Sequence, residues 1–124
     1  MIKTPETVAD PGRIEALAKQ IRNGVLSPVD LLQRYIDRID EVESQVQAWR
    51  ELCLDNARAE AETLTQEIED GKTRGPLHGI PIVIKDNIEF SSLPTTAGSL
   101  ALASNRTHRD SPLVARLQAA GAII

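Results

Sequence analysis

The sequence contains few aromatic residues, with one tryptophan, one tyrosine and one phenylalanine among 124 residues. A core in this chain is therefore expected to consist of leucine, isoleucine, valine and alanine, and the length is sufficient for one such core. The only cysteine is Cys53, which excludes an internal disulfide. Because a chain without a disulfide is typical of a reducing compartment, we expect a cytoplasmic protein.

Cationic stripes and long apolar segments are also absent from the sequence. The formal net charge is −4 and lysine and arginine are not concentrated anywhere, which argues against a nucleic-acid partner. The start, MIKTPETVAD, has no apolar signal segment, and no apolar run approaches the length of a membrane span, so no membrane association is expected. The histidines His78 and His108 belong to no cluster with metal-ligand spacing, and no metal site is predicted.

Three amphipathic helices are predicted in the first part of the chain, over residues 10–24, 27–46 and 54–71. Asp10 is the candidate amino-terminal cap of the first helix, and Ser27 followed by Pro28 is that of the second. Gly24 and Gly71 are suited to ending a helix in a left-handed conformation. Apolar residues recur every three or four positions and predict the buried faces. These positions are Ile14, Leu17, Ala18 and Ile21; Leu32, Tyr35, Ile36, Ile39, Val42 and Val46; and Ala57, Ala61, Leu64 and Ile68.

Beyond Gly71 the pattern changes from helical to mixed. Residues 71–81 are rich in glycine and proline and predict a loop. The run Ile82–Ile84 does not alternate with polar residues, which predicts a strand buried on both faces. Residues 111–121 predict a helix with Ser111 or Asp110 as its amino-terminal cap, and residues 122–124 begin a second apolar strand. Strand, helix and strand in this order predict a parallel pair joined by a right-handed crossover helix.

The predicted fold class is therefore α/β. Residues 1–70 are interpreted as an N-terminal helical arm, and residues 71–124 as the start of a mixed, largely parallel sheet. Residues 122–124 resemble the first half of a buried strand, and domains rarely stop inside a core element. We expect the sequence to be a piece of a longer protein.

Lys85 follows the apolar run directly and is the main candidate for chemistry. In one interpretation its stem lies along the sheet, while its amine reaches water or pairs with Glu89 or Asp110. In the other, the amine lies in a poorly solvated pocket, where its neutral form is favoured and can accept a proton. A neutral lysine is a general base, and with a serine it forms a hydrolytic pair that needs no histidine. The residues alone leave both interpretations open.

Three segments occur together in the order and spacing of a known enzyme family. They are GPLHGIPIVIKDNI at residues 75–88, PTTAGSLAL at residues 94–102 and RDSPLVARLQAAGAII at residues 109–124. From about Ser27 to Ile124 the chain resembles the amino-terminal third of the amidase-signature family. Each segment alone is a weak signal, and the three in register make the resemblance specific.

The resemblance implies an enzyme with a large α/β fold, which hydrolyses small-molecule amides with a Ser–cis-Ser–Lys triad. Lys85 falls on the catalytic lysine, whose role is proton transfer with the serine nucleophile through a bridging serine. No metal or organic cofactor is expected, because acyl transfer needs only a nucleophile, a base and stabilisation of the oxyanion.

The glycine- and serine-rich loop that the family implies is not found in these 124 residues. This loop carries both serines and the oxyanion-hole amides in the family. Ser91 and Ser92 lack flanking glycines and are interpreted as turn residues. We therefore expect the chain alone to be inactive as an amidase, because it has a base without a nucleophile.

Several residues near Lys85 are predicted to shape its surroundings. Asp86 and Asn87 are expected to bind backbone amides where the strand ends. Gly79 and Gly98 are expected to permit close approach of backbone segments. Hydroxyl groups that are candidates for ordering the pocket of the lysine belong to Thr95, Thr96 and Ser99.

Three further titratable side chains are predicted to have no catalytic role. Cys53 precedes a helix amid apolar residues, so we expect it to be buried and inert. His108 is expected in an exposed loop. His78 is close enough to GIP in sequence to line a pocket, but it is interpreted as a polar loop residue.

Two other functions stay open at this point. Proteins that amidate misacylated tRNA carry the same pattern, so the chain also fits a fragment of the amidase-like subunit of a tRNA-dependent amidotransferase. Alternatively, the chain is a non-catalytic remnant that self-associates, because an unfinished sheet has free edges that pair with other chains.

Overall fold

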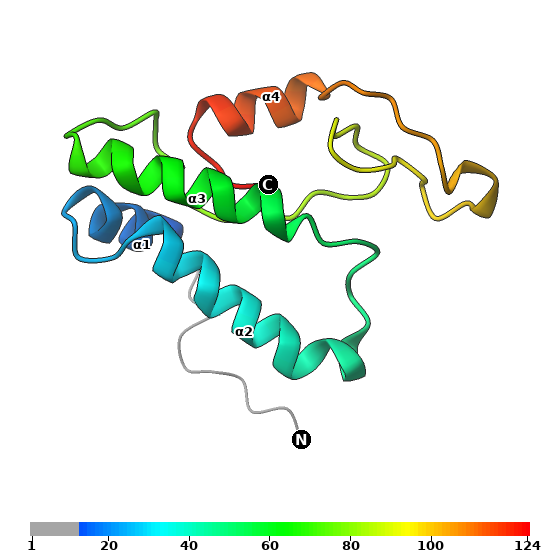
Figure 1. Cartoon of the computed structure of the whole chain (residues 1–124), viewed down its shortest axis with the longest axis horizontal. Helices are drawn as coiled ribbons and strands as arrows, with labels where there is room; N and C mark the ends of the chain where they lie inside the picture. The colour runs from blue at the N-terminus through cyan, green and yellow to red at the C-terminus, as the bar shows by residue number, and fades with distance from the viewer. Residues whose placement is uncertain (1–12) are drawn as a thin grey trace.

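The computed structural model describes residues 13–124 of the chain (Figure 1). The predicted cap Asp10 lies outside the described residues. In this range the chain forms four α-helices and one short 3₁₀ helix, η1. Their bounds are α1 Arg13–Arg22, α2 Pro28–Val46, α3 Leu54–Glu69, η1 Leu100–Leu102 and α4 Pro112–Ala119.

The helix boundaries follow from capping residues that the sequence predicts. Ser27 Oγ accepts a hydrogen bond from the Asp30 N–H at 2.9 Å, and Pro28 occupies the first turn of α2. Ser111 Oγ accepts the Val114 N–H at 3.2 Å at the start of α4. Gly24 follows α1 with a φ of 67°, a left-handed conformation that glycine adopts without strain. The predicted positions of these helices are confirmed.

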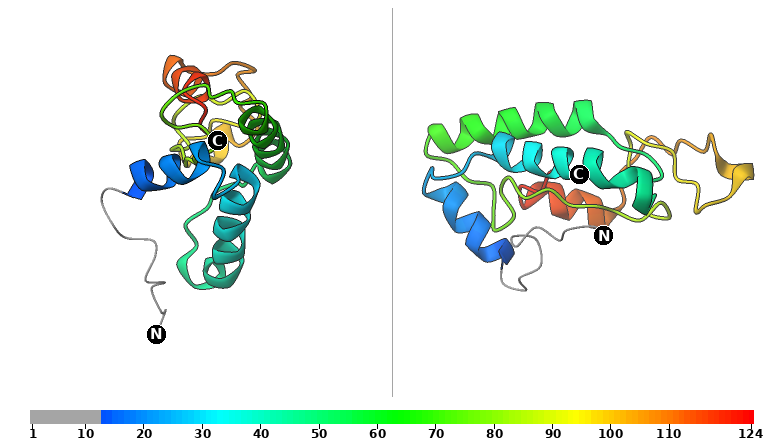
Figure 2. Two further views of the ribbon diagram at one scale, coloured as in Figure 1. Left: turned by 90° about the vertical axis from the view of Figure 1, so that its left-hand side faces the viewer. Right: turned by 90° about the horizontal axis from the view of Figure 1, so that it is seen from below.

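The centre of the molecule is the seam between α2 and α3, which lie side by side (Figures 1 and 2). Apolar residues recurring at helical spacing bring one face of each helix into this seam. Ile123 fills it from the other end of the chain and is only 1% exposed. The buried members of this cluster are Leu32, Ile36, Ala57, Ala61, Leu64 and Ile123.

A second cluster joins α1 to the start of α2. Ile21 and Ala18 of α1 pack with Leu26, Leu31 and Ile80, and all five are buried. Ile80 comes from the segment after Gly71, so both clusters contain residues from the first 70 positions and from the later part of the chain. The predicted buried face of α2 is only partly confirmed, because Val46 at its end is 50% exposed.

The predicted strands are represented by a single contact. Within residues 13–124 the β pairing consists of one isolated parallel bridge between Pro81 and Ile123. The Ile123 N–H donates to the Ile80 carbonyl at 3.0 Å, and the Ile82 N–H donates to the Ile123 carbonyl at 2.8 Å. The direction is the predicted one, but a sheet is not confirmed.

The prediction that the run Ile82–Ile84 is buried on both faces is wrong for this chain. Val83 is 63% exposed, and its two neighbours in the run are only half-buried. The physical reason is that no segment between residues 13 and 124 covers the side of the run on which Val83 lies. An apolar run shows that burial is favourable, but it does not show which chain supplies the cover.

His78 lies in a turn, as expected, but it is a core residue with 2% exposure. Its Nδ1 accepts the Arg74 N–H at 3.0 Å, which places the ring proton on Nε2, and Nε2 donates to the Leu64 carbonyl at 2.9 Å. The Arg74 side chain pairs with Glu67 at 2.7 Å, and its hydrogen bonds hold the pKa of Glu67 below its usual range. These contacts fix the loop that follows α3 against that helix. His78 is thus a polar loop residue, as predicted, but the sequence did not predict its burial, because its ring also bonds to the Leu64 carbonyl fourteen residues earlier.

Candidate active site

Lys85 lies where the extended run ends and a turn at residues 86–87 begins. Its side chain is exposed, so residues 13–124 alone do not provide the poorly solvated surroundings that a neutral amine requires. The alternative pairing is not found either. Glu89 pairs with Arg109 at 2.8 Å, and Asp110 Oδ1 accepts the Ser91 N–H at 2.8 Å. Within the described range Lys85 thus has no ion-pair partner.

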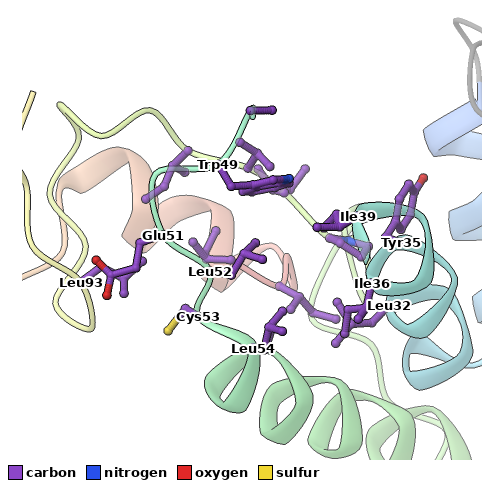
Figure 3. Close-up of a pocket in the computed structure, with 18 of the residues that line it drawn as sticks. Leu32, Tyr35, Ile36, Ile39, Trp49, Glu51, Leu52, Cys53, Leu54 and Leu93 are labelled. Carbon is purple, nitrogen blue, oxygen red and sulfur yellow. The ribbon is translucent and has the colours of Figure 1, made fainter. Parts of the chain in front are cut away.

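Lys85 borders an open groove of about 730 Å³ whose lining is mostly apolar. The groove lies between α2, the linker of residues 47–53 and the extended run of residues 80–85. Figure 3 shows Trp49 and Leu52 of the linker opposite Ile36 and Ile39 of α2. A concave apolar surface with few polar groups is the usual character of a binding site, so the lysine lies at the edge of a surface suited to contact.

Asp86 anchors the chain immediately after Lys85. Its carboxylate accepts the Thr96 N–H at 2.9 Å and the Thr96 hydroxyl, and its backbone carbonyl accepts the Ala97 N–H at 2.8 Å. These bonds, above all that from the Thr96 hydroxyl, hold the pKa of Asp86 below its usual range. The predicted role of Asp86 in binding backbone amides is confirmed, and the bonds fix the residue next to Lys85 to the turn at residues 96–98.

The three candidate hydroxyl groups behave differently. Thr96 is 2% exposed and completes the contact with Asp86. Ser99 is exposed and acts through its N–H, which donates to the Thr96 carbonyl at 2.9 Å. Thr95 Oγ1 is buried and has no hydrogen-bond partner within residues 13–124. Across the described range none of the three bonds to Lys85, and the exposed side chain of Asn87 has no partner there either.

The two glycines predicted for close approach differ in the same way. Gly79 has a φ of 79°, and a Cβ built on it would lie 2.6 Å from Pro28 Cγ, so its backbone closely approaches a side chain and not a second backbone segment. Gly98 has a φ of 75° but no atom within 4 Å of such a Cβ. Glycine at position 98 is therefore favoured by the left-handed backbone conformation, and no neighbouring atom approaches it closely.

The other residues singled out from the sequence have structural surroundings. Ser91 and Ser92 lie in a turn, and Ser92 Oγ accepts a hydrogen bond from the Asn56 amide at 2.7 Å. Cys53 is half-buried, and burial raises the pKa of its thiol, which makes it less reactive. His108 is exposed, as predicted. Among residues 13–124 no group of three or more metal-binding side chains is placed to hold an ion, and no helix is both long and apolar enough to cross a membrane.

The Asp86 contact predicts an acid-sensitive stability. The folded state keeps Asp86 ionised, whereas an unfolded aspartate is protonated below a pH of about 3.9, so the contribution of Asp86 is present above that pH and is lost as the pH falls below it. We expect Asp86→Asn to lower the free energy of unfolding at pH 7 by about 1–2 kcal/mol and to flatten its acid dependence. Urea unfolding between pH 2.5 and 7 measures both effects. Asp40→Asn, on the exposed side of α2, is the control, and equal pH profiles for both variants would contradict the role of Asp86.

Comparison with known proteins identifies the setting of this site. The sequence matches the Amidase family over residues 30–124. The chain belongs to the amidase family. The resemblance to the amidase-signature family that the sequence motifs indicate is thereby confirmed, and Lys85, Asp86 and the groove residues after position 30 lie inside the matched range.

Amidase-family relatives are much longer than this chain. The AmiB2 protein of Mycobacterium bovis is 40% identical over 109 residues, which are 88% of this chain and 23% of that protein. A glutamyl-tRNA(Gln) amidotransferase subunit of Salinispora tropica is 36% identical over 108 residues, with 87% and 22% covered. Native peptide amidase from Stenotrophomonas maltophilia is 41% identical and superposes with a TM-score of 0.83, with 89% and 23% covered. The chain thus spans about a quarter of the length of these relatives and has the fold that this part has in amidase-signature enzymes.

Sequence reasoning did not identify the linker between α2 and α3 as a wall of the groove that Lys85 borders. Trp49 and Leu52 line the groove, and Arg50 Nε lies 3.9 Å from Asp86 Oδ2. A signal was present, because large apolar residues in a short linker between two polar-faced helices need a surface to pack against. The pairing of Arg50 with Asp86 had no such signal, because the two residues meet only in the folded chain.

Proposed function

We propose that the chain is the lysine-bearing part of an enzyme that hydrolyses carbon–nitrogen amide bonds, with Lys85 as the general base. The observation that carries this proposal is the place of Lys85 within the family match. It ends an apolar run, borders an apolar groove and is followed by a residue anchored at two backbone amides. The residue next to this base is held in place, and the exposed amine itself needs a cover that excludes water.

The proposed reaction proceeds through an acyl-serine. A serine outside these 124 residues attacks the amide carbonyl, and its proton passes through a bridging serine to Lys85 Nζ. Collapse of the tetrahedral intermediate breaks the C–N bond, and the proton is returned to the leaving nitrogen. Water then attacks the ester by the same proton route and releases the carboxylic acid. The negative charge on the carbonyl oxygen requires N–H donors. We place these donors, like the two serines, outside these 124 residues.

This proposal predicts that the 124-residue chain alone does not hydrolyse amides. Loss of the nucleophile and of the oxyanion donors together removes many powers of ten in rate. We expect no release of ammonia from a peptide amide by the purified chain. We expect hydrolysis by a fusion protein in which residues 13–124 replace the matching segment of the peptide amidase of Stenotrophomonas maltophilia. A folded fusion protein without activity would contradict the proposed function, and so would activity of the chain alone that Lys85→Ala abolishes.

The likeness to the amidotransferase subunit of Salinispora tropica supports a second candidate function. In this function the substrate is the side-chain amide of glutamine. The same base would serve both reactions, and the parts that select the substrate lie outside this chain. A glutaminase assay of residues 13–124 joined to the remainder of that subunit tests it. We place either enzyme in the cytoplasm, because a single cysteine fits a reducing compartment.

A further inference from the structure

The turn at residues 96–98 binds the residue next to Lys85 through three hydrogen bonds. The Thr96 N–H donates to Asp86 Oδ1 at 2.9 Å, and the Thr96 hydroxyl donates to Asp86 Oδ2. The Ala97 N–H donates to the Asp86 carbonyl at 2.8 Å. Because the side chain and the backbone carbonyl of Asp86 are both bound, the rotation of this residue is restricted.

The orientation of the Thr96 hydroxyl is determined by its two partners. Its oxygen accepts the Gly98 N–H at 3.1 Å, and its single proton goes to the Asp86 carboxylate, which is an acceptor only when ionised. Thr96 is 2% exposed, so water does not compete for either bond. Arg50 Nε lies 3.9 Å from the same carboxylate oxygen, which is beyond hydrogen-bond distance. The arginine therefore does not replace the hydroxyl.

The backbone of this turn adopts a conformation that is unfavourable for its sequence. Ala97 has a φ of 49°, in the left-handed region, where the Cβ of an alanine lies too close to the following carbonyl oxygen. A turn that only connects two segments is formed more easily with glycine at such a position. Backbone strain that coincides with a buried polar contact indicates a functional constraint.

The same contacts determine where the Lys85 side chain leaves the backbone. The Lys85 carbonyl accepts the Ile88 N–H at 3.0 Å, and Asp86 is bound to the turn, so the chain is held on the carboxyl side of Lys85. The lysine stem itself is flexible and exposed, and the amine has no ion-pair partner within the described range. The position of the amine therefore depends on the backbone that carries it.

We propose that Thr96 is a positioning residue for Lys85, which acts through Asp86 and does not touch the reacting atoms. This inference rests on the proposed function, because it takes Lys85 to be the general base. The Thr96 hydroxyl fixes Asp86 and thereby the direction in which the lysine stem leaves the backbone. Proton transfer requires the amine within hydrogen-bond reach of a serine hydroxyl, and a displacement of about 1 Å can cost about 10²-fold in rate.

The test is a double-mutant cycle in the fusion protein that contains residues 13–124. Thr96→Val removes the hydroxyl and keeps the shape of the side chain. We expect it to lower kcat for a peptide amide by about 10–10²-fold with little change in KM, and Thr96→Ser to keep most of the rate. In the Lys85→Met background Thr96→Val should lower kcat no further, because no base remains to be positioned.

The matched control is Thr65→Val. The Thr65 hydroxyl also makes one hydrogen bond, to the Ala61 carbonyl at 2.8 Å, but it lies on α3 outside the groove lining, so kcat should stay unchanged. Asp86→Asn breaks the contact from the other side, because an amide has one oxygen and accepts only one of the two Thr96 bonds. It should show the same dependence on Lys85, and it takes the place of Thr96→Val in the cycle if circular dichroism shows that variant to be unfolded.

The outcomes separate positioning from stability and from the chemistry. Equal fold losses with and without the Lys85 amine would assign Thr96 to the stability of the turn alone and would overturn the proposal. An unchanged kcat of Thr96→Val, or an effect on KM alone, would overturn it as well. If Lys85→Met lowers kcat and Thr96→Val does not, the inference fails and the proposed function stands. If Lys85→Met leaves kcat unchanged, the proposed function itself is contradicted and the inference fails with it.

Discussion

Replacing Lys85 with methionine in the fusion protein is expected to lower kcat for a peptide amide by about 10²–10⁴-fold, the usual contribution of a general base. Methionine keeps an unbranched apolar stem of similar length but cannot accept a proton. KM should change little, because the amine acts on the serine proton and not on the bound substrate. Steady-state ammonia release over a range of substrate concentrations separates the two constants.

The control for this variant is another exposed lysine of the same chain. Lys19 lies on α1 outside the groove lining, and Lys19→Met should leave both constants unchanged. Lys85→Arg adds a second comparison, because arginine keeps the positive charge but is not deprotonated in proteins. Full activity of Lys85→Met, or of Lys85→Arg, would show that the amine is not the base.

Replacing Gly121 with alanine is expected to be the most destabilising of the simple substitutions. Gly121 has a φ of 91°, and a Cβ on it would lie 2.6 Å from the Cα of His78. The backbone around His78 cannot move away easily, because hydrogen bonds hold it on both sides. The Leu77 N–H donates to the Ala120 carbonyl at 3.1 Å, and the Gly79 N–H donates to the Gly121 carbonyl at 2.8 Å. We expect the free energy of unfolding to fall by about 3–5 kcal/mol, which is a large part of the stability of a small domain.

Gly71→Ala is the matched control for this effect. Gly71 has a φ of 73°, but no atom lies within 4 Å of a Cβ built on it. Only the left-handed conformation is then unfavourable, at a cost of about 1–2 kcal/mol. Urea unfolding followed by circular dichroism measures both changes. Similar losses for the two variants would mean that the close approach of Gly121 to His78 is not tight.

The helices were predictable because their signals are local. Periodic apolar residues and the capping groups of Ser27 and Ser111 act within one or two turns, and they fix the same elements in the folded chain. The bond of Asp86 was predictable in kind, because an aspartate after a strand commonly binds backbone amides. Its partner at Thr96 lies ten residues away, and the sequence alone did not select it.

Burial after Gly71 was harder to predict because it depends on distant partners. His78 is buried since its ring reaches the Leu64 carbonyl on α3, a contact that leaves no pattern around His78 itself. Val83 shows the opposite error. Its apolar neighbours indicated a core strand, but the cover for that strand is not provided within residues 13–124. Local apolar content therefore predicted which residues favour burial, and it did not predict which of them this chain buries.

The central claim is that Lys85 activates a serine that lies outside this chain. The most direct measurement is the site and rate of covalent labelling by a serine-reactive fluorophosphonate, followed by peptide mass mapping. The account predicts that the 124-residue chain is not labelled, that the fusion protein is labelled at one serine outside residues 13–124, and that Lys85→Met slows this labelling by about 10²-fold or more. Labelling of Ser91 or Ser92, or a rate that is the same with and without the Lys85 amine, would contradict it.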